Sequence, residues 1–491
     1  MSYGSGLRRD HASDGLILTL VCVAQFMVVL DVSIVNVALP SIGNDLHYST
    51  TGLQWVVNAY VLTFAGFLLL GGRAADLLGR RRIFIAGLSL FSLASLLGGL
   101  AQTSAELTTA RAVQGLGGAV LSPATLTIIM TTFDDGKARH RAIGLWSAVA
   151  GAGGASGAIL GGILTSGLSW RWVLFVNVPI GALAIAASYL LLTETPRLVG
   201  ERSLDLPGAV AATLGLSALV YAIVGTDTHG WGSVHTMVPL VASIVLLALF
   251  VLIQARFARS PLMPLSLFTS RSLSVANGVM TLLGVVFFSM WYFLTLYLQV
   301  VHRDSPIKAG LLFFPMGLTI MVGAQVGARL VTKLGPRRVL SVGLVSSAVG
   351  FVLLSRLSAD SSYAAGVLPG ALFTTYGAGM CFTPLAAAAT SGVPMQLAGL
   401  ASGVLNTARQ VGGSIGLAAL ATIATARTTD ALARHDSASR ALTQGYDRAF
   451  LVAAVVTAFA FLGSWLLPKH VRPAAEESRT ELGAPTPALL E

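Results

Sequence analysis

The sequence predicts an all-helical integral membrane protein with 14 transmembrane helices, arranged as two six-helix bundles with two helices inserted between them. Three observations lead to this fold class. The 491-residue chain is 54% hydrophobic and only 11% charged, whereas a soluble domain carries about 25% charged residues. Long apolar runs recur along the chain, and motifs of the first half return in the second half. The mean hydropathy of +0.77 indicates a protein that is solvated mostly by lipid.

The apolar runs are long enough to cross a hydrocarbon core, which takes roughly 20 helical residues. The first run is too long for the apolar part of a secretory signal, and no convincing cleavage site follows it, so we expect it to be retained. The predicted spans lie at about residues 16–39, 53–72, 83–101, 107–130, 142–164, 171–192, 207–226, 237–255, 272–301, 309–328, 338–356, 363–388, 398–424 and 447–467.

The orientation follows from the basic residues. Lys and Arg are more frequent on one alternate set of loops and tails, which the positive-inside rule assigns to the cytoplasm. Both termini are therefore predicted to be cytoplasmic, in a multi-pass protein of the plasma membrane. Segment 425–446 is predicted as an extracellular loop whose arginines run against the trend. The topology explains the formal charge of +10 better than nucleic-acid binding does.

The two halves of the chain share motifs in the same order. The glycines of GLWSAVAGAGGASG (144–157) match those of GVLNTARQVGGSIG (403–416) at a constant offset of 259 residues. Such a repeat predicts two parallel bundles. Two further pairs are GAVLSP (118–123) with GMCFTP (379–384), and LGRRRI (78–83) with LGPRRV (334–339). The predicted parts are an N-terminal bundle (1–193), two inserted helices (194–270), a C-terminal bundle (271–470) and a cytoplasmic tail (471–491).

Asp31 is the only carboxylate well inside a predicted span. A charge at such a position costs about 2.5–3.5 kcal/mol on insertion scales. Burial disfavours the charged form of a carboxylate and a nearby guanidinium favours it, so a site balanced between the two can bind and release a proton. Arg111 and Arg409 are the arginines within spans. We predict that Asp31 and Arg111 couple transport to protons; the alternative is a fixed tie between two helices.

Polar and aromatic residues within the spans are candidates for the substrate cavity. An aromatic cavity with sparse polar groups suits amphiphilic organic molecules, although some of these aromatics could instead face lipid or pack. The candidates are Gln25, Asn36, Asn58, Tyr60, Gln114, Trp291, Tyr292, Phe313, Phe314, Tyr376, Asn406, Arg409 and Gln410.

Four further motifs identify a family when they are taken together. They are GGRAADLLGRRR (71–82), RAVQGLGG (111–118), GAILGG (157–162) and WRWVLFVNVPIG (170–181). With them, the sequence resembles the major facilitator superfamily, in its fourteen-span drug:proton antiporter branch of EmrB/QacA-like multidrug exporters. The resemblance covers nearly the whole chain, from LDVSIVNVALP (30–40) to ARQVGGSIG (408–416).

The resemblance implies a conformational latch in the first of these motifs. Asp76 would lie near the cytoplasmic start of span thirteen, where a helix N-terminus carries partial positive charge. The contact would hold the cytoplasmic side closed. The alternative is that the arginines of this loop only set the topology. The latch residues are Gly72, Asp76, Gly79, Arg80 and Arg81.

Span five carries small residues at a spacing that lets helices approach closely. The helix-packing candidates are Gly153, Gly157, Gly161 and Gly162. In exporters that this chain resembles, the matching segment usually reads Gly-Pro where this chain has Gly157-Ala158. We therefore expect a weaker bend at this point.

Several functions are excluded. No G-x-x-x-x-G-K-[ST] motif occurs, so no built-in ATPase is expected. The G-x-S-x-G pattern at 412–416 lies inside an apolar span, with no strand before it, and does not indicate a hydrolase. Cys22 and Cys381 fall in spans, so neither a disulfide framework nor a metal site is expected.

We therefore expect a protein that is not an enzyme and needs no cofactor. The predicted function is proton-coupled efflux of amphiphilic drugs or antibiotics by alternating access. Its partners are the small amphiphilic substrate, protons and the lipid bilayer, and a monomer is expected. The alternatives are a self-resistance pump for one secondary metabolite, a facilitative importer of a small organic solute and a transporter-like receptor.

Overall fold

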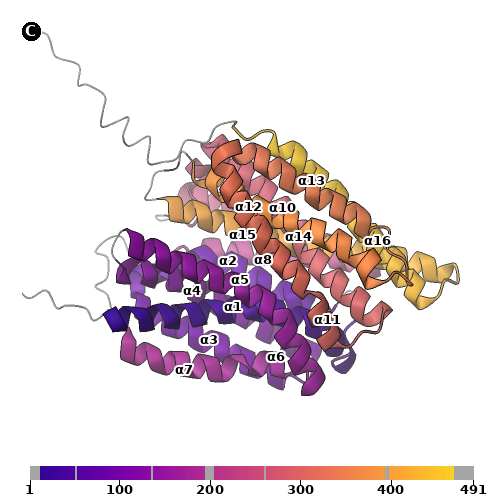
Figure 1. Cartoon of the computed structure of the whole chain (residues 1–491), viewed down its shortest axis with the longest axis horizontal. Helices are drawn as coiled ribbons and strands as arrows, with labels where there is room; N and C mark the ends of the chain where they lie inside the picture. The colour runs from indigo at the N-terminus through magenta and orange to yellow at the C-terminus, as the bar shows by residue number, and fades with distance from the viewer. Residues whose placement is uncertain are drawn as a thin grey trace, which may run out of the picture. The chain divides into compact units, whose positions relative to one another are not determined.

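A computed structural model of the chain describes residues 11–49, 52–133, 136–193, 204–258, 261–391, 393 and 397–468. These residues are almost entirely helical, and no strand occurs in the described ranges (Figure 1). The hydrocarbon core of a bilayer contains no water to hydrogen-bond the backbone. A helix solves this problem because its backbone N–H and C=O groups bond to one another.

The helices up to the middle of the chain are long and closely spaced in sequence. They are α1 (His11–Asp45), α2 (Trp55–Leu78), α3 (Arg80–Leu100), α4 (Ser104–Thr132), α5 (Lys137–Gly167), α6 (Trp172–Phe175), α7 (Asn177–Leu191), α8 (Leu206–His229) and α9 (Val234–Leu252), with a π-helical turn η1 (Ile253–Phe257).

The later elements follow after a short 3₁₀ segment, η2 (Leu265–Thr269). They are α10 (Arg271–Leu296), the π-helical turn η3 (Tyr297–Val301), α11 (Pro306–Leu312), α12 (Phe314–Leu334), α13 (Pro336–Leu354), the π-helical turn η4 (Tyr363–Val367), α14 (Leu368–Thr390), α15 (Ala398–Ala433) and α16 (Ala438–Ser464).

Each of the predicted spans falls on one of these helices or on a consecutive pair. Eleven helical segments of the described chain are long and apolar enough to cross a membrane. The other three spans correspond to α5, α14 and α15. The prediction of an all-helical membrane fold is confirmed.

Three boundaries differ from the prediction. The helix of span six is interrupted at Val176, and that of span ten at Phe313. The predicted extracellular loop 425–446 is mostly helical, because α15 continues to Ala433 and α16 begins at Ala438. Its alanines are strong helix formers. A side chain at Gly445 would also overlap the carbonyl of Ala424, so the two helices lie close there.

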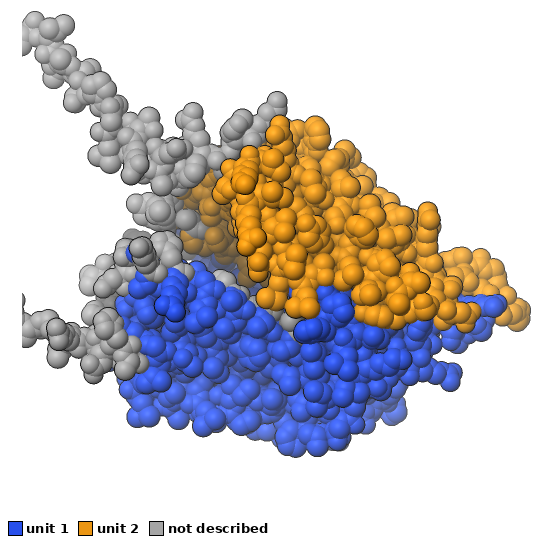
Figure 2. Space-filling model, in the orientation of Figure 1, with its two compact units in different colours: residues 1–262, 291–317, 437–442 blue, residues 263–290, 318–436, 443–491 orange. Residues whose placement is uncertain are grey.

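Contacts group the chain into two compact units (Figure 2). The first comprises Met1–Leu262, Trp291–Gly317 and Ser437–Leu442, and the second comprises Met263–Met290, Leu318–Asp436 and Thr443–Glu491. The boundary between the units falls inside α10. The predicted domain limits at residues 193, 270 and 470 remain predictions.

Both units contain the same glycine-lined helix crossing. In unit 1, an added Cβ at Gly157 of α5 would lie 2.6 Å from the Cβ of Ser33 on α1. In unit 2, an added Cβ at Gly416 of α15 would overlap Val285 of α10. Glycine is needed at both crossings because any side chain would separate the helices.

The repeat extends to a tight connection in each unit. Gly79, with φ of 102°, is the single residue between α2 and α3, and Gly335, with φ of 78°, separates α12 from α13. Glycine adopts positive φ without the penalty that a side chain brings. The predicted match between LGRRRI and LGPRRV is therefore a match of backbone geometry.

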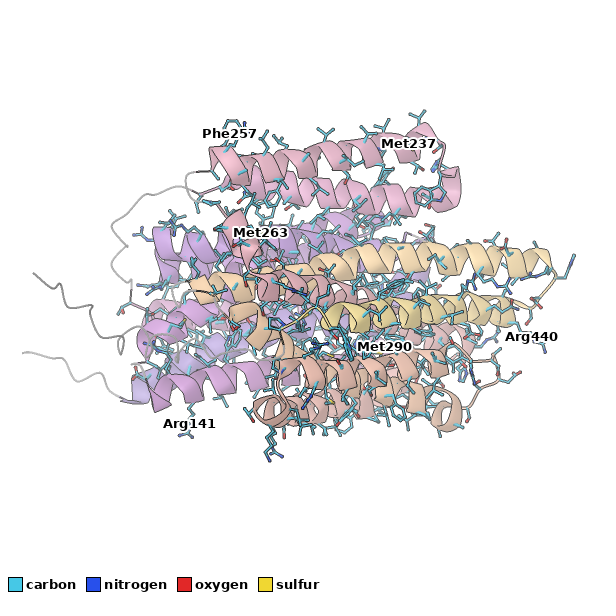
Figure 3. The ribbon with its side chains drawn as sticks, turned by 90° about the horizontal axis from the view of Figure 1, so that it is seen from above. Arg141, Met237, Phe257, Met263, Met290 and Arg440 are labelled. Atoms are coloured by element: carbon cyan, nitrogen blue, oxygen red, sulfur yellow. The ribbon has the colours of Figure 1, made fainter. Side chains whose placement is uncertain are left out.

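Helices α8 and α9 form a hairpin within unit 1, with α8 packed on α2. Asp205 caps α8 by accepting from the amide of Gly208 at 2.9 Å, and it also accepts from the side chain of Gln254. Figure 3 labels Met237 on α9 and Phe257 at the end of η1, and side chains are exposed along α9. An exposed apolar helix suits a position against lipid.

Candidate functional site

The site begins with the capped start of α4. Thr103 accepts from the amide of Glu106 at 3.2 Å, and the Glu106 carboxylate accepts from the amide of Thr103 at 3.3 Å. This reciprocal capping box fixes where the helix begins. Arg111 follows two turns later and is 2% exposed.

Glycines of α4 bring its neighbours close to this arginine. A Cβ at Gly115 would overlap the carbonyl of Tyr60 on α2. A Cβ at Gly117 would lie 2.6 Å from the amide nitrogen of Phe91 on α3. The motif RAVQGLGG therefore packs α4 tightly against α2 and α3 and buries the guanidinium between helices.

Asp31 of α1 is fully buried, at 0% exposure, and pairs with Arg111. One guanidinium nitrogen, Nη1, donates to Asp31 Oδ2 at 2.5 Å. Gln114 Nε2 donates to Oδ1 of the same carboxylate at 2.7 Å, and Asn177 Nδ2 donates to Oδ1 at 2.9 Å. The carboxylate thus receives donors from α4 and α7.

Arg111 is held by three further groups. Its Nε donates to the carbonyl of Val56 at 3.1 Å, and its Nη1 donates to Gln114 Oε1 at 2.7 Å. The guanidinium carbon lies 4.5 Å from the ring centroid of Tyr60, a cation–π contact. The arginine therefore keeps partners other than Asp31.

The groups that contact the Asp31 carboxylate oxygens all donate to them: the guanidinium of Arg111 and the amide nitrogens of Gln114 and Asn177. A protonated carboxyl would need an acceptor for its O–H, so an amide oxygen of Gln114 or Asn177 would have to turn toward it. Binding a proton therefore requires the cluster to rearrange.

Two members of this cluster were missed in the sequence. Asn177 and Ser95 are both 0% exposed, and Asn177 Nδ2 donates to Ser95 Oγ at 3.0 Å. Ser95 Oγ in turn donates to the carbonyl of Leu174 at 2.8 Å. The available signal was an amide inside the apolar stretch VLFVNVP, residues 173–179. Nothing in the sequence indicated Ser95.

Two predicted cavity residues belong to this ion-pair cluster. Gln114 is 1% exposed and Tyr60 is 0% exposed, with its ring against Arg111. The predicted contact of either residue with substrate remains a prediction. In this conformation their side chains hold the charged pair.

The other predicted polar residues of unit 1 lie apart from the pair. Gln25 Oε1 accepts from Ser122 Oγ at 3.0 Å. Asn36 donates to the carbonyl one turn earlier, at Val32, at 2.9 Å. Asn58 Nδ2 lies 3.5 Å from Gln54 Oε1 and is fully buried. Asn36, which is only partly buried, is the most accessible of these three.

The aromatic candidates fall in both units. In unit 1, the rings of Trp291 and Phe313 lie 5.1 Å apart, and Tyr292 is 2% exposed. Phe314, at 45% exposure, is on the surface of the chain. In unit 2, Tyr376 of α14 is partly buried. Their role in a cavity remains a prediction.

The other candidates of unit 2 share one face of α15. Arg409 Nη2 donates to Asn406 Oδ1 at 2.9 Å, and the guanidinium lies 5.9 Å from the ring centroid of Phe382. Gln410 is 5% exposed, and its Oε1 accepts no hydrogen bond from the described residues. Among the described residues, the polar and ring contacts of this arginine are with the amide of Asn406 and the ring of Phe382.

The predicted latch is described in part. Gly79 forms the turn between α2 and α3, and Arg81 donates to the carbonyl of Tyr189 on α7 at 3.1 Å. Gly72 lies beside Pro123, at van der Waals distance for an added Cβ. The Asp76 side chain falls outside the described side chains, so the latch, including the part expected of Arg80, remains a prediction.

The packing glycines of α5 lie against two different helices. Gly153, Gly157 and Gly161 contact α1, where an added Cβ at Gly161 would lie 2.6 Å from the carbonyl oxygen of Ile34. An added Cβ at Gly162 would lie 2.6 Å from the carbonyl oxygen of Pro306 on α11. The carbonyl of Ala158 faces Gly310 of α11 equally closely. The Gly157-Ala158 pair therefore serves two close helix contacts within unit 1.

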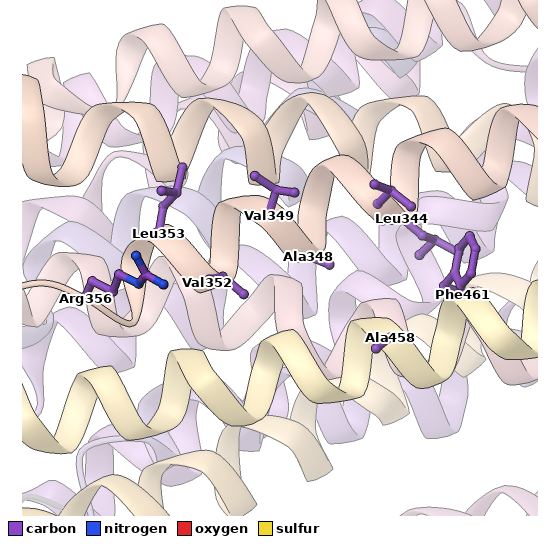
Figure 4. A pocket seen from close by; sticks show the side chains of 9 residues that line it. Leu344, Ala348, Val349, Val352, Leu353, Arg356, Ala458 and Phe461 are labelled. Atoms are coloured by element: carbon purple, nitrogen blue, oxygen red, sulfur yellow. The ribbon is translucent and has the colours of Figure 1, made fainter.

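A groove of about 370 Å³ lies between α13 and α16 in unit 2 (Figure 4). Its lining is apolar except at Arg356, and it includes Val349, Val352 and Phe461. None of the predicted cavity residues lines it.

The chain has two repeated helical halves and a buried ion pair inside one of them. Both features are typical of secondary transporters. The chain belongs to the Major Facilitator Superfamily, whose family model matches residues 21–417. The resemblance noted in the sequence is thereby confirmed.

Named relatives align over most of the chain. The cephamycin export protein CmcT of Amycolatopsis lactamdurans is 45% identical over 440 residues, which cover 89% of each chain. The puromycin resistance protein pur8 of Streptomyces alboniger is 40% identical over 469 residues, covering 94% of this chain and 92% of the relative. The multidrug resistance protein Stp of Mycobacterium tuberculosis is 36% identical over 423 residues.

Solved structures share the fold. A bacterial homolog of the human lysosomal transporter Spinster, in an inward-facing and unoccupied conformation, superposes with a TM-score of 0.68 at 17% identity. The match covers 95% of this chain and 100% of that one. At this identity the likeness supports the fold alone.

Proposed function

We propose that this transporter exports drug-like organic molecules in exchange for protons, with Asp31 as the proton-binding group. The relatives named above are export and resistance proteins, and they align over most of the chain. They support a transporter rather than an enzyme, and efflux as its direction. Proton coupling is our inference from the site.

The observation that carries the proposal is the environment of Asp31. A fully buried carboxylate is costly in a membrane helix, and such residues are functional by default. Here it faces a guanidinium and two amide donors. A transporter that moves protons needs such a group, poised between burial and pairing.

The geometry suggests how protonation would act. A proton on Asp31 removes the negative partner of Arg111, and the new O–H would need an amide oxygen of Gln114 or Asn177 to turn toward it. Arg111 retains Val56, Gln114 and Tyr60, all on α2 or α4. Protonation therefore weakens the attachment of α1 to α4 while α4 stays bound to α2. The protonation state of Asp31 would thereby favour one arrangement of α1 and α4 over another.

The remaining features follow from the sequence. We place the protein in the plasma membrane with both termini in the cytoplasm, because basic residues dominate that set of loops. We infer that it acts as a monomer on amphiphilic compounds, and that the Asp76 motif closes its cytoplasmic side.

Inverted vesicles with an imposed pH gradient, acidic inside, test the proposal. Puromycin and a cephamycin are suitable first compounds, given the names of the relatives. The wild type should accumulate one of these compounds until the gradient is collapsed, and Asp31→Asn should abolish gradient-driven accumulation.

Asp45→Asn is the matched control, since Asp45 is on the same helix but lies at the surface, paired with Arg171. It should retain transport. Full gradient-driven transport by Asp31→Asn would refute the coupling role, and accumulation only in the opposite direction would refute efflux.

A further inference from the structure

Arg409 of α15 is a cation in the interior of unit 2 that has no acidic partner among the residues that the structure describes. The described residues place no carboxylate within ion-pair distance, and its side-chain hydrogen bond is to Asn406. A guanidinium has five N–H donors, so most of them remain unused here. An uncompensated charge at membrane depth is costly and is retained where it serves a function.

The space beside the guanidinium is enclosed by helices of the same unit. Its lining includes Phe287 of α10, Phe351 of α13, and Phe382 and Thr374 of α14. The two hydroxyls in the lining already donate to main-chain carbonyls: Ser347 to that of Thr374, and Thr374 to that of Gly370. The lining therefore supplies aromatic surface and no negative charge.

The position of Arg409 is fixed by the helix crossing of this unit. An added Cβ at Gly284 of α10 would overlap the carbonyl of Arg409, so the two backbones are in contact there. The side chain is partly buried and so still reaches accessible space. A fixed and partly accessible guanidinium is prepared to receive a ligand.

We propose that Arg409, with Asn406 beside it, binds the carboxylate of an anionic amphiphilic substrate. The planar guanidinium matches a carboxylate with two parallel hydrogen bonds, and an anion would supply the missing charge. The cavity at its side measures about 10 Å³, room for about one water-sized group, so the lining side chains would have to move apart to admit a ligand. The charged end of the ligand would then face Arg409, while the aromatic side chains would contact the adjoining apolar part. This inference adds a substrate class to the proposed efflux.

Binding to the purified full chain tests this proposal without relying on transport. Three probe pairs are suitable: benzylpenicillin, 4-phenylbutyrate and 1-pyrenebutyrate, each with its methyl ester. At least one carboxylate should bind the wild type more tightly than its ester, by roughly tenfold or more, as followed by the concentration dependence of thermal stabilisation.

Substitutions at Arg409 test whether the preference for the carboxylate over the ester depends on this residue. Arg409→Gln should remove the preference for the carboxylate and leave ester binding unchanged, whereas Arg409→Lys should keep part of it. Arg356→Gln, at an exposed arginine of the same unit, is the control for a lost charge and should keep the full preference.

Other results overturn the proposal. They are the absence of any carboxylate preference in the wild type, an unchanged preference in Arg409→Gln, or an equal loss of acid and ester binding in that variant. Asp31→Asn separates this proposal from proton coupling, because that variant should lose coupling yet keep the carboxylate preference.

Discussion

The two halves of the repeat share their helix crossings and differ in their buried charges. In unit 1, Asp31 and Arg111 form a fully buried pair. When the repeats are aligned at the offset of GAVLSP and GMCFTP, 261 residues, Leu372 aligns with Arg111. Gly157 packs on Ser33 and Gly416 on Val285, so Leu283 of α10 takes the place of Asp31. Unit 2 therefore has no counterpart of the pair, and carries Arg409 instead.

The two halves therefore share their helix packing and differ in their buried ionisable groups. The glycines are needed wherever backbones touch, and both halves retain them. The ionisable groups are not needed for that contact. We infer that unit 1 handles the proton and that unit 2 recognises the charge of the substrate.

The largest expected effect is the contrast between removing Arg111 and removing Arg409. Arg111→Met leaves the Asp31 carboxylate buried without its partner, which should lower the free energy of unfolding by about 3–5 kcal/mol. Arg409→Met removes a cation that has no acid, so it should be neutral or stabilising. Unfolding of both purified variants in detergent measures the contrast.

A double variant sharpens this comparison. Asp31→Asn combined with Arg111→Met should be less destabilised than the two single changes added together, because no unpaired charge remains. Additive losses would mean that the two residues stabilise the fold independently and are not a coupled pair.

The glycine crossings should respond alike in the two units. Gly157→Leu and Gly416→Leu both place a side chain against a neighbouring backbone, and each should cost about 1–3 kcal/mol or more of stability. Gly144→Leu is the control, since an added Cβ there meets nothing within 4 Å. If only one of the two crossings were sensitive, the structural equivalence of the halves would be wrong.

A smaller difference in stability is expected between variants that replace two buried amide side chains. Asn177→Leu removes two hydrogen bonds, one to Asp31, and should destabilise the protein by about 1 kcal/mol, since such bonds are weak in membrane proteins. Gln410→Leu removes an amide whose oxygen has no partner among the described residues, and should be neutral or stabilising. Thermal unfolding of the two variants in one detergent would compare them, and equal losses would contradict this account.

The fold could be predicted from the sequence because hydropathy and spacing report lipid exposure directly. The breaks at Val176 and Phe313 could not, since the apolar run continues through both. The helical ends of 425–446 were also missed, because a polar segment between spans is normally a loop. Its helices are stabilised by a contact between residues well separated in sequence, at Gly445 and Ala424.

The candidate site was predicted in part for a similar reason. Asp31 and Arg111 stand out because charge is rare in apolar spans. Asn177 and Ser95 do not, since a single amide or hydroxyl is common there and only the fold shows what it contacts. Gln114 was assigned to the cavity because sequence cannot show which polar residues bond to one another.

Asp31 should be the group that binds the transported proton. The most direct measurement follows pH with an indicator dye, in weakly buffered purified protein, as the compound transported by vesicles is added. The wild type should release protons in proportion to the bound compound at acidic pH, and Asp31→Asn should bind it without releasing any. Equal proton release from both proteins would contradict the account.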